Sequence, residues 1–239
     1  TKFREPLAKR YINGVLQSAY KKGKWWALIH SVPIQIIKNE KIICPQRNRY
    51  NLFGYEEGET YASADVYYIS SNKNNFSLKY ILSILNSKLV YFWLYWMGKR
   101  KGEMLELYFE PLQFIPIKKA STSDQKAFIR ITEYILFSKK QTYSDVSYQL
   151  MPTYFEQIVD GMVYDLYFPE LLKKHNREII KHLDELPEFT DGMSDEQKMK
   201  ICKKVFDRLN DKEHPIRINL FYMNSIPEIA IIEGKNENN

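Results

Sequence analysis

The first half of the chain is divided into short runs of apolar, β-branched and aromatic residues with turn residues between them. Such runs have the composition of β-strands, and five are found, at residues 25–30, 41–44, 61–69, 105–109 and 113–117. Residues 48–54 and 56–59 are rich in Asn, Gly and charge and are typical of loops. Pro111 and Pro116 limit how far the last two runs can extend. This pattern predicts a β-rich region.

One helix is predicted inside this region, over residues 77–97. Its apolar side chains recur at helical spacing, at Ile81, Leu85, Leu89, Phe92 and Trp96. Gly98 and the basic run 99–101 follow directly, and both glycine and cations are favoured at the C-terminal end of a helix. We therefore expect the helix to end at Gly98 and the basic run to form a loop.

After residue 120 the apolar positions recur at helical spacing. The segment from Thr122 to Gln125 fits a capping box, and Ser194 with Gln197 fits a second one. Four helices are expected, one after each capping box and two more at about 154–167 and 170–186. Residues 214–223 are interpreted as a late strand, and the polar tail 233–239 is predicted to be disordered.

Together these patterns predict the α+β fold class. Residues 1–120 would form a β-rich domain with a central apolar helix, and residues 121–239 a helical C-terminal region.

The charge is distributed unevenly between these two parts. The chain has a net charge of +6, but residues 1–120 contain 19 Lys and Arg against 9 Asp and Glu, whereas residues 121–239 contain 16 against 20. The basic excess therefore lies wholly in the first part, where it would attract a polyanion such as nucleic acid. A solvated basic face without a partner gives the same numbers, so charge alone leaves both interpretations open.

Cysteine content and hydropathy indicate a protein of the cytoplasm. Cys44 and Cys202 lie far apart and form no C-x-x-C pattern, which favours a reducing compartment without disulfides or a structural zinc site. No signal peptide is visible, and the longest apolar stretch, residues 89–97, is well short of the ~18 residues of a membrane span. The chain begins with Thr1, and we expect it to be a piece of a longer protein.

The motifs of common enzymes are absent from the sequence. There is no Pro-Pro dipeptide, which excludes the Asn-Pro-Pro-aromatic motif of amino-methyltransferases. Glycine patterns of dinucleotide and phosphate sites and the G-x-S-x-G elbow are also missing. His175 and His182, two turns apart on the predicted helix, have no partner at metal spacing, so we interpret them as surface residues. We predict no catalytic residue, metal or cofactor in this chain.

One acidic pattern keeps a nuclease hypothesis open. Asp184, Glu196 and Lys198 loosely resemble the D…E-x-K metal site of many nucleases. Glu196 and Lys198 fall in the first turn of a capped helix, however, where acidic and polar residues are common. The nuclease hypothesis predicts metal-dependent cleavage that is lost in Glu196→Ala.

A family resemblance appears between residues 41 and 117. The segments KIICP (41–45), YASADVYYI (61–69), YILSILNSKL (80–89), GKRKG (98–102) and LQFIPI (112–117) resemble, in order and spacing, the TaqI-like C-terminal specificity domain. This domain is found in type IIG restriction–modification enzymes and related adenine-N6 DNA methyltransferases. Residues 123–140 are similar to the spacer helix of type I specificity subunits, and residues 154–170 look like a C-terminal element of the same large proteins.

The resemblance implies that residues 1–120 form a DNA target-recognition domain and that residues 121–239 form a spacer that braces it. In the family a methyltransferase domain, which binds S-adenosylmethionine, lies N-terminal to this region. The partners implied are therefore double-stranded DNA and that methyltransferase domain. The chain would read DNA sequence and would not be an enzyme on its own.

Base readout requires side chains such as Arg for guanine and Asn or Gln for adenine. The loop after the strand at 41–44 supplies all three types, and we expect base contacts from Gln46, Arg47, Asn48, Arg49 and Asn51. Cations and glycines suit phosphates, and the expected phosphate contacts are Lys21, Lys22, Lys24, Lys99, Arg100, Lys101 and Gly102. For the base contacts and for the phosphate contacts alike, the alternative is a polar surface loop that does not bind DNA.

The remaining interpretations concern the tryptophans and functions other than DNA recognition. The four tryptophans, Trp25, Trp26, Trp93 and Trp96, are predicted to lie in the core and not to stack on bases. The alternative function is a helical protein-interaction or scaffold module whose basic part is incidental, which predicts no salt-dependent binding to duplex DNA. An RNA-binding role has no support from an RNP-type motif or a GXXG loop.

Overall fold

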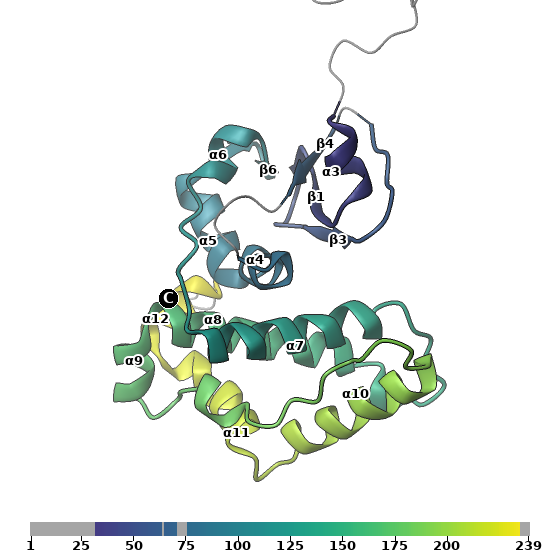
Figure 1. Cartoon of the computed structure of the whole chain (residues 1–239). Coiled ribbons are helices and arrows are strands. Elements are labelled where there is room, and N and C mark those ends of the chain that lie inside the picture. Colours follow the sequence, from purple (N-terminus) through teal and green to yellow (C-terminus); the bar gives the residue numbers. More distant parts are fainter. Residues whose placement is uncertain (1–31, 64, 71–75, 235–239) are drawn as a thin grey trace, which may run out of the picture.

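The computed structural model describes residues 32–63, 65–70 and 76–234. The predicted strand at 25–30, Trp25, Trp26 and the tail beyond residue 234 lie outside the described residues. Two parts are visible in Figure 1, an upper one that contains the strands and a lower one that is entirely helical. The α+β class and the helical C-terminal region are thereby confirmed. No helix within the described ranges has the length and apolar character needed to cross a membrane.

The first sheet follows helix α3 (Ile34–Lys38) and is built around β1 (Lys41–Pro45). β1 pairs with β3 (Gly54–Glu56) on one side and with β4 (Val66–Ile69) on the other, both antiparallel. Ile42 and Cys44 alternate along β1 and are fully buried, which is the period of two that a half-covered strand shows. The strand predicted at 41–44 is confirmed, whereas only the end of the run 61–69 forms a strand.

The second sheet has the order β2-β6-β5 and is formed by β2 (Arg47–Asn48), β6 (Met104–Glu106) and β5 (Lys99–Lys101). The loop predicted at 99–101 was wrong, because Lys101 pairs with Met104 across a two-residue turn. Gly102 has φ +62° in this turn, a backbone conformation that glycine adopts without strain.

Gln46 connects the two sheets through its backbone. Its N–H donates to the carbonyl of Asp65 and its carbonyl accepts from the N–H of Leu107, both at 2.8 Å. The sheets are thus fixed to each other at the residue between β1 and β2.

The single helix predicted over 77–97 is instead two helices, α4 (Leu78–Leu85) and α5 (Lys88–Met97). Ser87 begins the second helix, since its hydroxyl accepts from the N–H of Val90. Asn51 stabilises the break, because its side-chain amide donates to the carbonyls of Leu85 (2.7 Å) and Ser87 (2.9 Å). The apolar spacing continues across the break, which is why periodicity alone did not reveal it.

The two later strand predictions were correct only in part. β6 occupies Met104–Glu106, but the chain then forms helix α6 (Phe109–Gln113), and residues 113–117 contain no strand. Pro111 lies within the first turn of α6, where its missing N–H is not needed.

The lower part contains six α-helices among its described residues: α7 (Thr122–Ser138), α8 (Met151–Tyr167), α9 (Pro169–Lys174), α10 (Asp195–Leu209), α11 (Pro215–Tyr222) and α12 (Pro227–Ile232). The capping box of Ser194 and Gln197 at α10 is confirmed. At α7 the cap lies one residue earlier than predicted, because the hydroxyl of Ser121 accepts from the N–H of Asp124.

Two predictions in this part were wrong. The helix expected over 170–186 ends at Lys174, where Asn176 takes φ 55° and the N–H of Arg177 donates to Leu172 at 2.9 Å. This is the left-handed stop that Asn tolerates, so His175 and His182 do not share a helix. Within the strand predicted at 214–223, Pro215–Tyr222 instead form helix α11, and the side chain of His214 caps its start by accepting from the N–H of Ile216.

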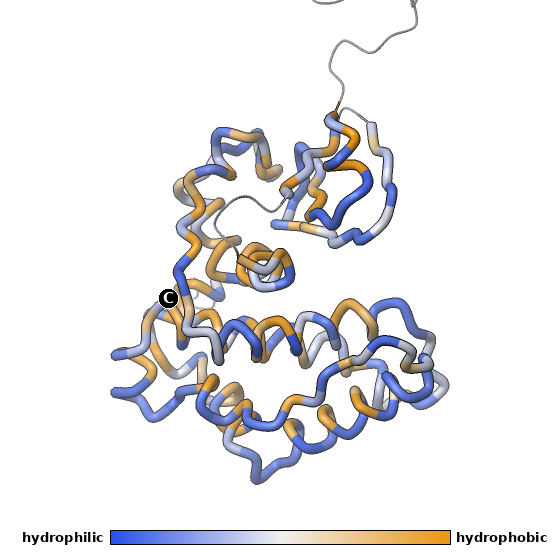
Figure 2. The backbone as a smooth tube through the Cα atoms, viewed as in Figure 1, coloured by the Kyte–Doolittle hydropathy of each residue, from blue (hydrophilic) through white to orange (hydrophobic). Residues whose placement is uncertain are grey.

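The two parts share one hydrophobic core. Helix α4 packs on α7, where the rings of Tyr80 and Phe128 meet edge-to-face at 5.3 Å, and both side chains are fully buried. Figure 2 shows apolar segments in α4 and in the neighbouring α7, while many outer loops of the lower part are hydrophilic. One cluster of buried hydrophobic side chains contains residues of both parts, from Ile42 on β1 to Ile229 on α12. A domain boundary at residue 120 remains a prediction.

Asp160 links the two parts through its carboxylate, and its side chain is 14% exposed. Its carboxylate on α8 accepts from the backbone N–H of Lys88 at 2.8 Å, at the start of α5. The ammonium of Lys88 lies 3.9 Å from Asp160 and 3.1 Å from Glu233. Burial raises the pKa of Asp160 to about 7, although the N–H and the charge of Lys88 act in the opposite direction.

We predict that unfolding experiments will show the titration of Asp160. Its pKa is higher in the folded protein than in the unfolded chain, so its stabilising contribution is complete below about pH 4 and is lost as the pH rises through 7. The free energy of unfolding, measured with urea at pH 4.5 to 8, should fall by on the order of 2–4 kcal/mol from this group. In Asp160→Asn this component should disappear, and an unchanged pH profile in the variant would contradict the prediction.

Candidate nucleic-acid interface

The second sheet brings the two predicted sets of DNA contacts together. β2 carries Arg47 and Asn48 from the first set, β5 carries the cations of the second set, and β6 lies between them. Arg47 and Lys99 are both paired in register with Glu106. Directly opposite residues of an antiparallel ladder lie on the same face, so these three side chains share one face of the sheet.

The opposite face of the sheet is buried at its middle strand β6, while Arg100 on the edge strand β5 stays exposed. Leu105, the next residue of β6, is 1% exposed, and its register partners are Asn48 and Arg100. The face that carries Arg47 and Lys99 is therefore the one that a large ligand can approach.

Glu106 holds two cations on the outer face. Its carboxylate accepts from Arg47 Nε at 3.3 Å and lies 3.7 Å from Lys99 Nζ. The side chain of Glu106 is 8% exposed, against 48% for Arg47 and 63% for Lys99. The buried acid thus orients the two cations, whose outer parts remain accessible.

The other cations of the sheet lie around its edge. Arg100 stacks on the ring of Tyr95, with its guanidinium carbon 3.9 Å from the ring centroid, and Lys101 is exposed. Arg49, just beyond β2, is paired with Glu103 at 2.8 Å, and both side chains are more than half exposed. An exposed ion pair contributes about 0–1 kcal/mol, so a DNA group can replace Glu103 at little cost.

The remaining predicted residues have different surroundings. Asn51 uses its amide inside the fold, as described above, and Gln46 connects the sheets. Asn48 accepts the N–H of Arg49 at 2.9 Å with its side-chain oxygen, which shapes the end of β2. Gly102 forms the turn between β5 and β6. Lys21, Lys22 and Lys24 lie outside the described residues.

The two described tryptophans differ. Trp93 is partly buried and packs against the core, as predicted. The core prediction was wrong for Trp96, which is 63% exposed at the end of α5. Helical spacing places residues on faces, but it does not tell which end of a helix projects beyond the core.

An aromatic hollow beside the sheet was missed by the sequence analysis. It has a volume of about 670 Å³, lies between α5, the segment after β2 and the end of α12, and is lined by the rings of Tyr50, Tyr91, Phe92, Tyr95 and Trp96. The signal in the sequence is the i, i+4 spacing of Tyr91 with Tyr95 and of Phe92 with Trp96. Only Phe92 and Trp96 entered the prediction, as apolar positions of the helix at 77–97.

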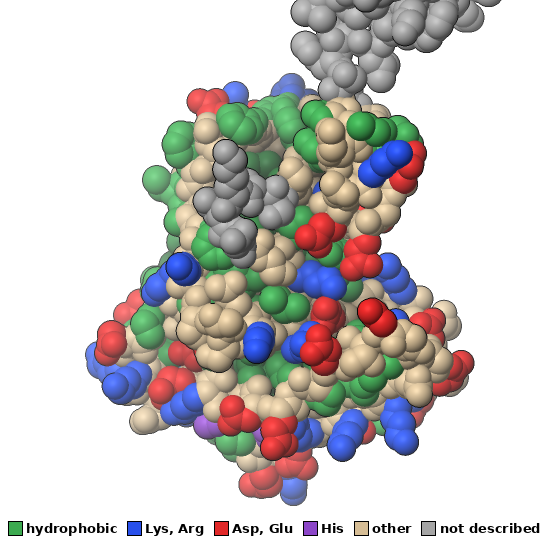
Figure 3. Space-filling view, in the orientation of Figure 1, with side chains coloured by type: hydrophobic (Ala, Val, Ile, Leu, Met, Phe, Trp, Pro, Cys, Tyr) green, Lys and Arg blue, Asp and Glu red, His purple; other side chains and the backbone are tan. Residues whose placement is uncertain are grey.

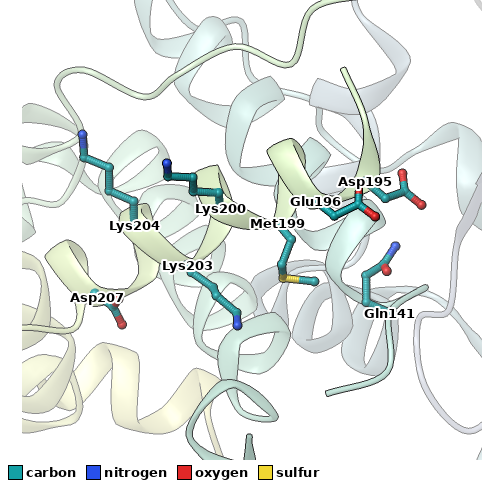
Figure 4. A pocket seen from close by; sticks show the side chains of 8 residues that line it. All are labelled: Gln141, Asp195, Glu196, Met199, Lys200, Lys203, Lys204 and Asp207. Carbon is teal, nitrogen blue, oxygen red and sulfur yellow. The ribbon is translucent and has the colours of Figure 1, made fainter. Parts of the chain in front are cut away.

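The residues of the nuclease hypothesis do not converge. Glu196 lies with Gln141 at a hollow on α10 that also contains Lys200, Lys203 and Lys204 (Figure 4). The ammonium of Lys198 lies 6.0 Å from the ring centroid of Phe189, and the backbone of Asp184 accepts from Arg208. The hydroxyl of Ser194 lowers the pKa of Glu196, as expected at a helix cap. Within the described ranges, no three His, Cys, Asp or Glu side chains gather as a metal site.

On the face shown in Figure 3, Lys and Arg side chains of the helical part are intermixed with Asp and Glu. On this face, the helical part therefore has no patch that is only positively or only negatively charged. The sheet β2-β6-β5 remains the best candidate for contact with a polyanion among the described residues.

Comparison with known proteins identifies a family for the first part of the chain. No curated protein matches the chain. The family model of the TaqI-like C-terminal specificity domain matches residues 2–117, a range that includes both sheets, α4 and α5. This first part of the chain therefore belongs to the family of TaqI-like C-terminal specificity domains.

Proposed function

We propose that the chain recognises a specific sequence in double-stranded DNA. The observation that carries this proposal is the sheet β2-β6-β5, which places Arg47 and Lys99 side by side on an accessible face within the specificity domain. In this account the chain is the specificity region of a cytoplasmic, type IIG-like restriction–modification protein. Its adenine-N6 methyltransferase domain, which would bind S-adenosylmethionine, lies N-terminal, and this chain contributes no catalytic residue.

The sheet suggests how the DNA would be read. A narrow antiparallel ribbon fits the major groove of B-DNA, and Arg and Asn are the side chains that read guanine and adenine there. Arg47 and Arg49 are the proposed base readers, because Arg47 lies on the accessible face of β2 and Arg49 follows directly after the strand. Asn48 is less suited, because it pairs with Leu105 on the other face and its side-chain oxygen accepts from the N–H of Arg49. Gln46 stays a weaker candidate, and Asn51 is left out since its amide stabilises the helix break.

The cations of β5 are proposed to contact phosphates. Lys99 and Lys101 are exposed and alternate with Arg100 along a strand that also ends the sheet. Phosphate contacts fix the register of a protein on DNA and supply most of its salt-dependent affinity. The helical part then braces the recognition domain through the shared core and does not itself read bases.

The proposal is tested by fluorescence anisotropy of the purified chain with a labelled duplex at several salt concentrations. The affinity should fall steeply with salt, with a slope of log K against log salt of roughly −3.5 to −5.5 for four to six phosphate contacts. A folded chain that does not bind duplex even at low salt would contradict autonomous recognition and would favour the scaffold alternative.

Glu106→Gln is expected to increase affinity for duplex DNA. The substitution keeps the shape of the side chain but removes the negative charge that lies next to Arg47 and Lys99. Both cations then act on DNA without an internal competitor, and the affinity near 0.1 M salt should rise roughly three- to tenfold. Anisotropy titration measures this, with Glu213→Gln in the helical part as the control of equal charge. Equal effects of the two substitutions would contradict a DNA surface at the sheet.

A further inference from the structure

The aromatic hollow beside the sheet contains a continuous series of rings. Tyr50 lies 6.0 Å from Tyr91, Tyr91 lies 6.1 Å from Tyr95, and Tyr95 lies 5.3 Å from Trp96, measured between ring centroids. Tyr50 is 61% exposed and Trp96 is 63% exposed. Large aromatic side chains with so much free surface in one hollow are unusual on a protein without a ligand there.

The hollow is continuous with the proposed DNA surface. Tyr50 follows β2 by two residues, and Trp96 precedes β5 by three. Tyr95 belongs to both places, because it lines the hollow and carries the guanidinium of Arg100 on its ring at 3.9 Å. A DNA strand that contacts Arg100 therefore passes the opening of the hollow.

The charges at the hollow suit a nucleotide. Arg100 stands at the end near the sheet, where it can contact a phosphate. At the other end the ammonium of Lys88 lies 3.1 Å from Glu233 and 3.9 Å from Asp160, so it offsets part of the negative charge of these carboxylates. The volume of about 670 Å³ is within the range of small-molecule sites and is sufficient for one nucleotide.

We propose that this hollow binds one unpaired nucleotide of the recognised DNA, with its base stacked on Trp96 and the adjoining tyrosines and its phosphate near Arg100. Stacking on aromatic side chains requires a base face that a paired base in a duplex does not offer. The site would therefore distinguish DNA with an extruded nucleotide from a regular duplex. This inference rests on the proposed function, because the DNA must first bind at the sheet.

The test compares two labelled duplexes of the same sequence, one of which has a single additional unpaired nucleotide. The chain should bind the duplex with the unpaired nucleotide roughly tenfold more tightly. Trp96→Ala should reduce this preference to within about twofold and leave the affinity for the regular duplex nearly unchanged. Phe109→Ala is the control, since Phe109 is 69% exposed on α6 and does not line the hollow.

A cross-link identifies the site directly. With 5-iodouracil as the unpaired base, ultraviolet light should attach the DNA to Tyr50, Tyr91, Tyr95 or Trp96, which mass spectrometry of the digested protein locates. Equal binding of both duplexes, an unchanged preference in Trp96→Ala, or attachment only at residues outside the hollow would overturn the nucleotide site and leave the proposed function intact. A folded chain that binds neither duplex would overturn both.

Discussion

Replacement of Lys99, Arg100 and Lys101 by alanine is expected to weaken binding to duplex DNA roughly ten- to hundredfold near physiological salt. All three residues lie on β5, at the edge of the sheet, and Lys99 and Lys101 point to the accessible face. Because each lost phosphate contact reduces the counterions released, the slope of log K against log salt should become less steep by about 2 to 3. Anisotropy titrations at four or more salt concentrations give both quantities.

The matched control removes three positive charges from the helical part. Lys200, Lys204 and Lys212 are exposed, and the first two line the hollow on α10 in Figure 4. Their joint replacement by alanine changes the net charge by the same amount, so it should reproduce only the small long-range effect of net charge. If both triple variants lose affinity equally, the sheet is not the DNA surface and the binding is non-specific electrostatic attraction.

Phe128→Ala is expected to cause the largest loss of stability, about 3–5 kcal/mol. The ring is fully buried on α7 and packs edge-to-face against Tyr80 of α4, so its removal leaves a cavity where the two parts of the molecule meet. Urea unfolding followed by circular dichroism measures the loss. Phe221→Ala, whose ring is 77% exposed on α11, should cost less than about 1 kcal/mol.

The same experiment tests whether the two parts fold as one unit. A core that is continuous from β1 to α12 predicts a single transition for the wild-type chain, and Phe128→Ala should shift that transition as a whole. Two separate transitions, with only one displaced in the variant, would contradict the shared core.

The predictable parts of the fold are those that local chemistry determines. β1 was predicted because apolar residues precede a polar turn, and α10 because a capping box precedes an amphipathic stretch. Asn176 shows the limit, since its left-handed backbone ends α9 inside an otherwise helical pattern. The break between α4 and α5 depends on Asn51, which is more than thirty residues away along the chain, and local periodicity contains no information about it.

The candidate site was predictable in its residues but not in its geometry. Arg47 and Lys99 were singled out for their charge, yet their pairing through Glu106 depends on a sheet in which β2 joins two strands that lie about fifty residues later in the chain. The family resemblance supplied the expectation that both segments face DNA, which charge alone left open. Trp96 was assigned to the core because spacing cannot reveal where a helix projects beyond its neighbours.

The most direct test of sequence recognition at the sheet is selection from a pool of duplexes with a randomised segment, followed by sequencing of the bound fraction. The wild-type chain should enrich one short motif, and Arg49→Ala should still bind DNA but lose the preference at one or two positions of that motif, at about 1–3 kcal/mol per position. Binding without enrichment of any motif, or an identical motif for the wild type and for variants of Arg47 and Arg49, would contradict the account.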